Sequence, residues 1–142
     1  MSEENVELVR RLQPPPGVDL TQMFRDEDFR LVLENLAPLF SDRFVAVFHA
    51  LGAHSYKGID GLRQLWLDWL APWESYHVEI DKLTEVGDRV LVYTRDHGRR
   101  RGMDAEVELV GSAVWTVEGG QVSRVEFFTE RSEALEAAGL SE

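Results

Sequence analysis

The stretch that decides the fold is Gly87–Gly102, "GDRVLVYTRDHGRRRG". Within it, Arg89–His97 alternates in the manner of a β-strand, and the preceding Val86–Asp88 ("VGD") predicts a turn. The stretch then ends in three arginines and a glycine, which lack the strand-to-helix context of a phosphate-binding loop and are typical of a solvated hairpin end. The pattern predicts one strand of an antiparallel meander.

Strand signals continue on both sides of this stretch. "YHVEI" alternates in the same way, "EGGQ" predicts a hairpin loop, and an earlier Val- and Phe-rich run is too short for an independent helix. The predicted strands, besides Arg89–His97, are Phe44–Ala50, one beginning at Tyr76–Ile80, Val107–Val117 and Val122–Glu130, with a loop over Gly52–Gly58.

Four helices are predicted from 3.6-residue periodicity and from end signals. Asp60 is expected to cap a helix with an aromatic stripe that ends at Pro72, and Ser132 to cap a last helix stopped by Gly139. The predicted helices are Ser2–Leu12, ended by the three prolines that follow, a stretch from Asp19 to Leu36, Asp60 to Leu70, and Ser132 to Leu140. Helices, one strand, a helix and then a meander predict an α+β fold with its helices on one side.

Composition limits the partners. The 142 residues, 44% of them hydrophobic, suit one domain over residues 1–142. A count of 15 Lys and Arg against 26 Asp and Glu gives a net charge of −11, which repels nucleic acid. No apolar run approaches the roughly 20 residues of a membrane span, and the acidic N-terminus is unlike a signal peptide, so we expect a cytoplasmic protein that binds no membrane.

Metal and cofactor chemistry finds little support in the sequence. With no cysteine the chain has no disulfide, no thiolate zinc site and no cysteine nucleophile. The four histidines lack metal-binding spacing; they are His49, His54, His77 and His97. We therefore expect no metal and no cofactor.

Three segments of the chain are distinctive together, namely "YKGIDGLRQLWLDWL", "GDRVLVYTRDHGRRRG" and "VEFFTERSEALEAAGL". With them, the chain resembles the SnoaL-like family of the nuclear transport factor 2-like superfamily. The resemblance covers nearly the whole chain and implies a cone, in which a curved antiparallel sheet wraps around helices and leaves a pocket. It also implies homodimers that pair sheet faces. Its members include ketosteroid isomerase, limonene epoxide hydrolase, polyketide cyclases and binding proteins, so the fold does not fix the function.

Arg95 and His97 are the candidate catalytic pair. They share one face of their strand with Leu91 and Tyr93, whereas Val90, Val92, Thr94 and Asp96 share the other, and which face lines the cone stays open. The resemblance suggests the pair because the epoxide hydrolase branch has Arg-x-Asp on this strand. A histidine base and a guanidinium for an oxyanion would suit proton transfer. Alternatively, Arg95 pairs with an acid such as Glu126, and His97 is solvated; Asp96 is expected at the surface.

The last strand departs from the patterns of the family. Phe127 stands where the resemblance places the epoxide hydrolase acid, and Thr129 lies near the position of the cyclase acid, so neither mechanism transfers. Glu126 and Glu130 alternate away from these positions and would reach a pocket only through a bulge. In the first strand, Phe48 and Ala50 replace polar water-holding groups of the epoxide hydrolases, and His49, between them, is expected as a surface or interface residue.

An aromatic set is the stronger signal for a ligand site, because ligand pockets are mostly apolar. Two or three of its rings are expected to touch a cavity and the others to pack in the core, with Trp66 and Trp115 as the first choices. The candidate ligand-binding residues are Phe48, Trp66, Trp69, Tyr93, Trp115, Phe127 and Thr129.

Three functions are compatible with these observations. The first is a pocket protein for a small apolar or polycyclic molecule, oriented by Arg95. The second is a cofactor-independent isomerase, cyclase or epoxide hydrolase that uses Arg95 and His97. The third is a homodimeric scaffold without chemistry, whose cone is filled by its own aromatic side chains.

Overall fold

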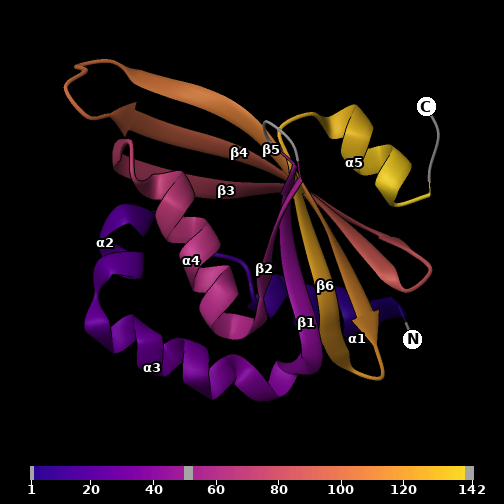
Figure 1. Ribbon diagram of the computed structural model, residues 1–142. Coiled ribbons are helices and arrows are strands. Elements are labelled where there is room, and N and C mark those ends of the chain that lie inside the picture. Colours follow the sequence, from indigo (N-terminus) through magenta and orange to yellow (C-terminus); the bar gives the residue numbers. More distant parts are fainter. Residues whose placement is uncertain (1, 50–52, 140–142) are drawn as a thin grey trace.

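The computed structural model describes residues 2–49 and 53–139 and has an α+β architecture (Figure 1). Its helices are α1 (Ser2–Arg11), α2 (Leu20–Arg25), α3 (Glu27–Leu36), the short 3₁₀ helix η1 (Ala37–Leu39), α4 (Gly58–Leu70) and α5 (Arg131–Ala137). Its strands are β1 (Phe40–His49), β2 (Ala53–Lys57), β3 (Trp73–Val86), β4 (Arg89–Arg100), β5 (Glu106–Glu118) and β6 (Gln121–Phe128). The α+β fold class is thereby confirmed.

The six strands form one curved sheet in the order β2-β1-β6-β5-β4-β3. The sheet is mixed, which corrects the expectation of a purely antiparallel one, because β1 and β6 run parallel. The chain leaves β1 through β2 and α4, and the meander β3 to β6 then brings the last strand beside the first in the same direction. Ala53–Lys57, expected as part of a loop, forms the edge strand β2.

The meander is closed by tight glycine turns, as the sequence indicated. Gly119 and Gly120 both have positive φ, 59° and 79°, between the last residue of β5 and the first of β6. A two-residue hairpin turn with positive φ at both positions matches the twist of the flanking strands. The register of β5 and β6 is set locally by this turn, with one irregularity near Thr116.

Helix ends differ from the sequence expectation at three points. Helix α5 begins at Arg131, with Glu130 rather than Ser132 in the N-cap position. The stretch from Asp19 to Leu36 is two helices, because Asp26 is extended and its side chain caps α3 by accepting from the Asp28 N–H. The same residue ends α2 by donating its backbone N–H to carbonyls of that helix. Helix α4 begins at Gly58, with Lys57 rather than Asp60 in the N-cap position. Ala50 and Leu140, expected at element ends, lie outside the described residues.

Both faces of the sheet are covered over part of its area. Helices α1, α2 and α4 pack their apolar residues into clusters with one face, for example Leu20 and Leu70 against Trp73 and Tyr76. On the other face, α5 buries Ala134 against Leu91, Val114 and Phe128. The sequence had suggested that all helices lie on one side of the sheet, and this expectation is wrong because α5 lies on the other side (Figure 1).

None of the described helices has the length and apolar character required to cross a membrane.

Candidate functional site

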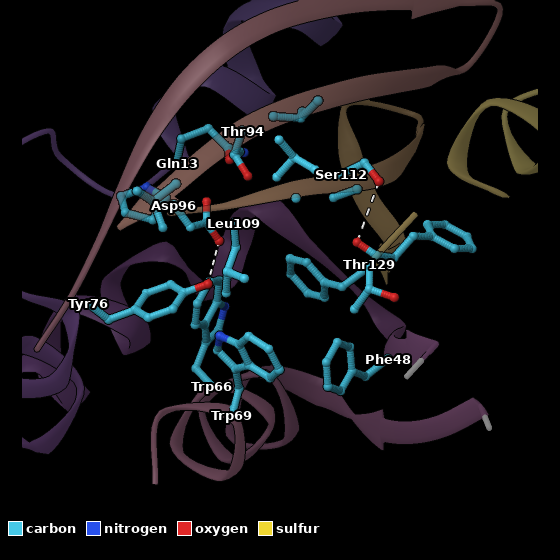
Figure 2. A pocket seen from close by; sticks show the side chains of 18 of the residues that line it. Gln13, Phe48, Trp66, Trp69, Tyr76, Thr94, Asp96, Leu109, Ser112 and Thr129 are labelled. Carbon is cyan, nitrogen blue, oxygen red and sulfur yellow. Dashed lines mark hydrogen bonds between the residues drawn. The ribbon is translucent and has the colours of Figure 1, made fainter. Parts of the chain in front are cut away.

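A cavity of about 180 Å³ lies between α4 and the face of the sheet against which α1, α2 and α4 pack (Figure 2). Aromatic rings from β1, α4 and β6 form its apolar wall, and residues of β3, β4 and β5 form its floor. The lining residues are Gln13, Pro14, Phe48, Leu65, Trp66, Trp69, Tyr76, Val78, Val92, Thr94, Asp96, Leu109, Val110, Gly111, Ser112, Ala113, Phe127, Phe128 and Thr129.

Thr94 and Asp96 are the residues by which β4 supplies polar groups to the cavity. Asp96 is 8% exposed, so the expectation of a surface position is wrong. The reason is the pairing register, which sets Asp96 opposite Val78. Cross-strand partners share a face, and Val78 belongs to the buried cluster with Leu20 and Tyr76.

Tyr76 and Asp96 form the polar end of the cavity. The Tyr76 hydroxyl donates a hydrogen bond to Oδ2 of Asp96 across 2.5 Å (Figure 2). The other carboxylate oxygen, Oδ1, is buried and has no hydrogen-bond partner among the described residues. A buried acceptor without a partner costs about 1–3 kcal/mol. The site therefore holds an unused acceptor beside an apolar space.

Burial shifts the acid–base properties of both groups. It raises the pKa of the Asp96 carboxyl above its ordinary value, an effect that the hydroxyls of Tyr76 and Thr94 and the nearby His97 oppose without cancelling. Burial also raises the pKa of the Tyr76 hydroxyl, and the adjacent Asp96 raises it further, so the phenol keeps its proton. Within this pair, Asp96 is therefore the group that can gain or lose a proton.

Gly98 and Gly111 have no side chain, and this leaves room for Tyr76, Asp96 and their neighbours. A Cβ at Gly98 would come within 2.7 Å of the Trp73 ring and 3.0 Å of the Tyr76 ring. A Cβ at Gly111 would come within 2.6 Å of the Thr94 hydroxyl oxygen. Real Cβ atoms do not approach that closely, so these glycines shape the floor of the cavity.

Five of the candidate ligand-binding residues line the cavity: Phe48, Trp66, Trp69, Phe127 and Thr129. Their rings are in mutual contact, with Phe48 and Trp69 centroids 5.3 Å apart and Trp66 and Phe127 centroids 5.6 Å apart, both edge-to-face. Such arrangements fix ring orientation. Four of the candidate aromatic rings therefore line the cavity, where two or three were expected.

The other two candidates, Tyr93 and Trp115, do not line this cavity. Tyr93 lies on the opposite face of the sheet, where the Arg131 guanidinium sits 4.5 Å from its ring centroid. Trp115 is 4% exposed and packs in the main core cluster with Val90 and Val125. Trp115 was one of the two first choices, and it belongs to the rings that only pack.

Arg95 and His97 lie on the face of β4 that points away from the cavity. Arg95 is half exposed, and its nearest acid is Asp81 at 3.7 Å rather than Glu126. His97 Nε2 lies 3.3 Å from Glu79, and its Nδ1 lies 3.7 Å and 3.9 Å from Glu106 and Glu108. The two side chains thus contact acidic side chains on the outer surface.

Glu126 also points away from the cavity, as strict alternation predicted. It accepts a hydrogen bond from His49 Nε2 at 2.9 Å and pairs with Arg124 at 3.2 Å. The His49 ring stacks on Phe128, with ring centroids 4.5 Å apart. The last strand keeps its register from Arg124 to Phe128 against both neighbours, so no bulge turns Glu126 inward.

Sequence reasoning missed several residues of the site, chiefly Gln13, Pro14, Tyr76, Thr94, Asp96 and Leu109. The position of Asp96 follows from the register that pairs it with Val78, which the sequence alone does not give. Nor did any sequence signal point to Gln13 and Pro14, which reach the cavity from the segment after α1. Across residues 2–49 and 53–139, no group of three or more acidic or histidine side chains is arranged to hold a metal ion.

Comparison with solved structures shows the same fold at low sequence identity. A protein from Jannaschia sp. CCS1, provisionally assigned as a SnoaL-like polyketide cyclase, is 22% identical with a TM-score of 0.67 over 99% of this chain and 95% of that one. A protein of ketosteroid isomerase-like fold from Catenulispora acidiphila DSM 44928, solved in complex with trimethylamine, is 20% identical with a TM-score of 0.59 over 84% and 88%. An LEH-like epoxide hydrolase from M. tuberculosis is 14% identical with a TM-score of 0.56 over 96% and 90%.

These likenesses establish fold and not activity. No protein with curated annotation matches the chain. A family model described as "SnoaL-like domain" matches residues 17–125, which include α2 to β5 and most of β6. With that match over most of its length, the chain belongs to the SnoaL-like domain family.

Proposed function

We propose that this protein binds a small, mostly apolar molecule in the cavity between α4 and the sheet. The single observation that carries the proposal is the Asp96 carboxylate, whose Oδ1 is buried at the cavity without a partner. Folded proteins satisfy nearly all their buried polar groups, and an exception needs an explanation. A ligand that donates a hydrogen bond to Oδ1 would remove the free-energy cost of leaving this buried acceptor without a partner.

The size and lining of the cavity agree with this proposal. An engineered cavity of about 150 Å³ with apolar walls binds benzene, so 180 Å³ suits a ligand of about one ring. Aromatic walls with a few polar groups are typical of small-molecule sites. The Catenulispora relative forms a complex with trimethylamine, which is likewise a small organic molecule.

A test of the pocket is to block its mouth. Thr129 lines the cavity and is exposed, so Thr129→Trp adds bulk at the entrance without a core change. Glu130→Trp places the same bulk one residue further on, where the side chain does not line the cavity, and is the matched control. A panel of one-ring and two-ring molecules would be screened by thermal shift and tryptophan fluorescence. We expect shifts in the wild type and in Glu130→Trp that disappear in Thr129→Trp; no shift with any compound would refute the proposal.

A second candidate function is catalysis of proton transfer, with Asp96 as general acid or base. The observation that favours it is the raised pKa of Asp96, which moves the group toward the pH at which such catalysts work. In this proposal Asp96 replaces Arg95 and His97, because a catalytic group must reach the bound molecule. Turnover lost in Asp96→Asn and kept in His97→Gln would support it, and the reverse pattern would return the role to His97.

Homodimerisation and a cytoplasmic location stay predictions. The exposed apolar side chains Ile80 and Val107, whose cross-strand partners Thr94 and Gly98 share one face of β4, support a contact between copies. Sedimentation velocity tests it: a single monomeric species at micromolar concentration would contradict the dimer. A scaffold filled by its own side chains is disfavoured because the aromatic rings leave an open volume.

A further inference from the structure

We propose that the ligand is a small organic amine, bound as its ammonium cation with an N–H donating to Asp96 Oδ1 and its hydrocarbon part among the aromatic rings. This inference rests on the proposed small-molecule function and specifies the ligand class. It is drawn from the charge, the hydrogen bonding and the wall of the cavity.

The charge of the site is the first argument. Asp96 is the one residue with a formal charge among the described residues that line the cavity, and no cationic side chain among them faces it. A carboxylate buried in this way is unfavourable unless it is protonated or paired with a cation. A cationic ligand supplies the pairing that the protein omits. The net charge of −11 favours the approach of a cation over that of an anion.

Hydrogen bonding around the carboxylate gives the second argument. The Tyr76 hydroxyl already donates to Oδ2, so it fixes the carboxylate plane and leaves Oδ1 as the free acceptor. The raised pKa of Tyr76 keeps it a donor. The hydroxyls of Tyr76 and Thr94 are neutral donors that do not offset the burial of this carboxylate, and an ammonium N–H would form a stronger, charge-assisted bond to Oδ1.

The aromatic wall gives the third argument. Trp69 stands between Phe48 and Tyr76, with ring centroids 5.3 Å and 6.1 Å away and nearly perpendicular ring planes. Trp66 and Phe127 continue the wall. The faces of aromatic rings carry negative potential and attract alkylammonium groups, which is how aromatic cages select such ligands. The same rings also provide the apolar contact that a one-ring hydrocarbon needs.

The pH dependence separates a cationic ligand from a neutral one. Around Asp96, β3 contributes Tyr76 as a titratable group, and β4 contributes His97 from its opposite face, where Glu79, Glu106 and Glu108 surround it. The described lining residues from β5, α4, β1, β6 and the Gln13–Pro14 segment carry no titratable group. Ammonium binding needs ionised Asp96, so affinity falls as pH drops through the pKa of that carboxyl. A carbonyl ligand needs the protonated acid, so its affinity changes in the opposite direction.

The test compares three molecules that share one ring: cyclohexylammonium, cyclohexanol and cyclohexanone. Binding to the full chain is measured by calorimetry and tryptophan fluorescence from pH 4 to 8. We expect cyclohexylammonium to bind at least about tenfold more tightly than either neutral analogue at pH 7, to weaken toward pH 4, and to lose at least about tenfold in Asp96→Asn. Glu79→Gln removes the same charge from the outer face of β3, and we expect it to leave binding unchanged.

Two results would overturn the inference. If cyclohexanone or cyclohexanol binds as tightly as cyclohexylammonium, or if Asp96→Asn keeps the amine affinity while its near-ultraviolet circular dichroism shows a native fold, the ligand is not a cation on Asp96. If none of the three binds, the amine class is refuted as well. In each case the proposed pocket function is judged separately, by whether other panel compounds bind and are blocked by Thr129→Trp.

Discussion

Gly111 and Thr94 are cross-strand partners, and a Cβ on the glycine would lie 2.6 Å from the threonine hydroxyl oxygen. The same Cβ on Gly111 would lie 3.4 Å from Asp96 Oδ2 and 3.7 Å from Asp96 Oδ1. The absence of a side chain at Gly111 is thus what lets the polar residues of β4 occupy the cavity floor. The size of the site therefore depends on Gly111, a residue that has no side chain to contribute to it.

Gly111→Ala should therefore damage the site more than the fold. We expect Thr94 and Asp96 to be displaced, the free energy of unfolding to fall by about 1–3 kcal/mol as in other overpacked interiors, and ligand affinity to fall with it. Chemical denaturation and a binding assay measure the two effects. Val110→Ala, at the half-exposed neighbour, should change stability by less than about 0.5 kcal/mol. Unchanged binding in Gly111→Ala would contradict the geometry described for the floor.

Tyr76→Phe removes the hydroxyl that satisfies Asp96 Oδ2 while it keeps the ring in the apolar cluster. Because that hydrogen bond lowers the pKa of Asp96, its loss should raise this pKa further. We expect a loss of about 1–3 kcal/mol at neutral pH, because Oδ2 of the carboxylate loses its donor. Carboxyl chemical shifts of Asp96, followed through a pH titration by NMR, would show the change. A pKa that stays the same would mean that Tyr76 does not hold the charged form.

Asp96→Asn should stabilise the free protein at neutral pH. A carboxyl whose folded pKa is raised keeps its proton in the folded state after the unfolded chain has released it, so folding becomes less favourable as pH rises above the ordinary value of 3.8. The amide carries no such cost and can still accept from Tyr76. The difference in unfolding free energy between variant and wild type should grow from pH 4 to pH 7. A difference independent of pH would show that Asp96 is not desolvated.

Most of the secondary structure could be predicted from the sequence, and so could five of the nineteen residues that line the cavity. Helix α4 and its Trp66 and Trp69 follow from periodicity, since one face of an amphipathic helix must be buried. The inner face of β4 could not be chosen by alternation, because α5 covers the outer face and both Val90 and Leu91 are buried. The parallel pairing of β1 with β6 joins segments about 80 residues apart, which no local pattern specifies.

Asp19 links α2 to the site strand and should matter for stability. Its Oδ1 accepts hydrogen bonds from the Thr21 N–H, the Thr21 hydroxyl and the Tyr76 N–H, at 3.0, 2.7 and 3.1 Å. Asp19→Ala removes the helix cap and leaves these donors without their acceptor, so we expect a loss of about 1–3 kcal/mol in the free energy of unfolding. Asp26→Ala, which removes the corresponding side-chain cap of α3, is an exposed comparison. If both variants lose the same amount, the link to Tyr76 contributes nothing.

The contribution of Glu126 to folding stability should change with pH in the opposite direction to that of Asp96. Burial acts to raise the pKa of this carboxyl, but the hydrogen bonds from His49 and Arg124 outweigh it, so the pKa lies below its ordinary value of 4.5. A depressed pKa contributes stability above the ordinary value, and this contribution is lost as pH falls through the folded-state pKa. We expect Glu126→Gln to cost about 1 kcal/mol at pH 7 and progressively less below pH 4, as measured by urea unfolding at each pH. A cost that persists in acid would mean that shape, not charge, holds His49 and Glu126 together.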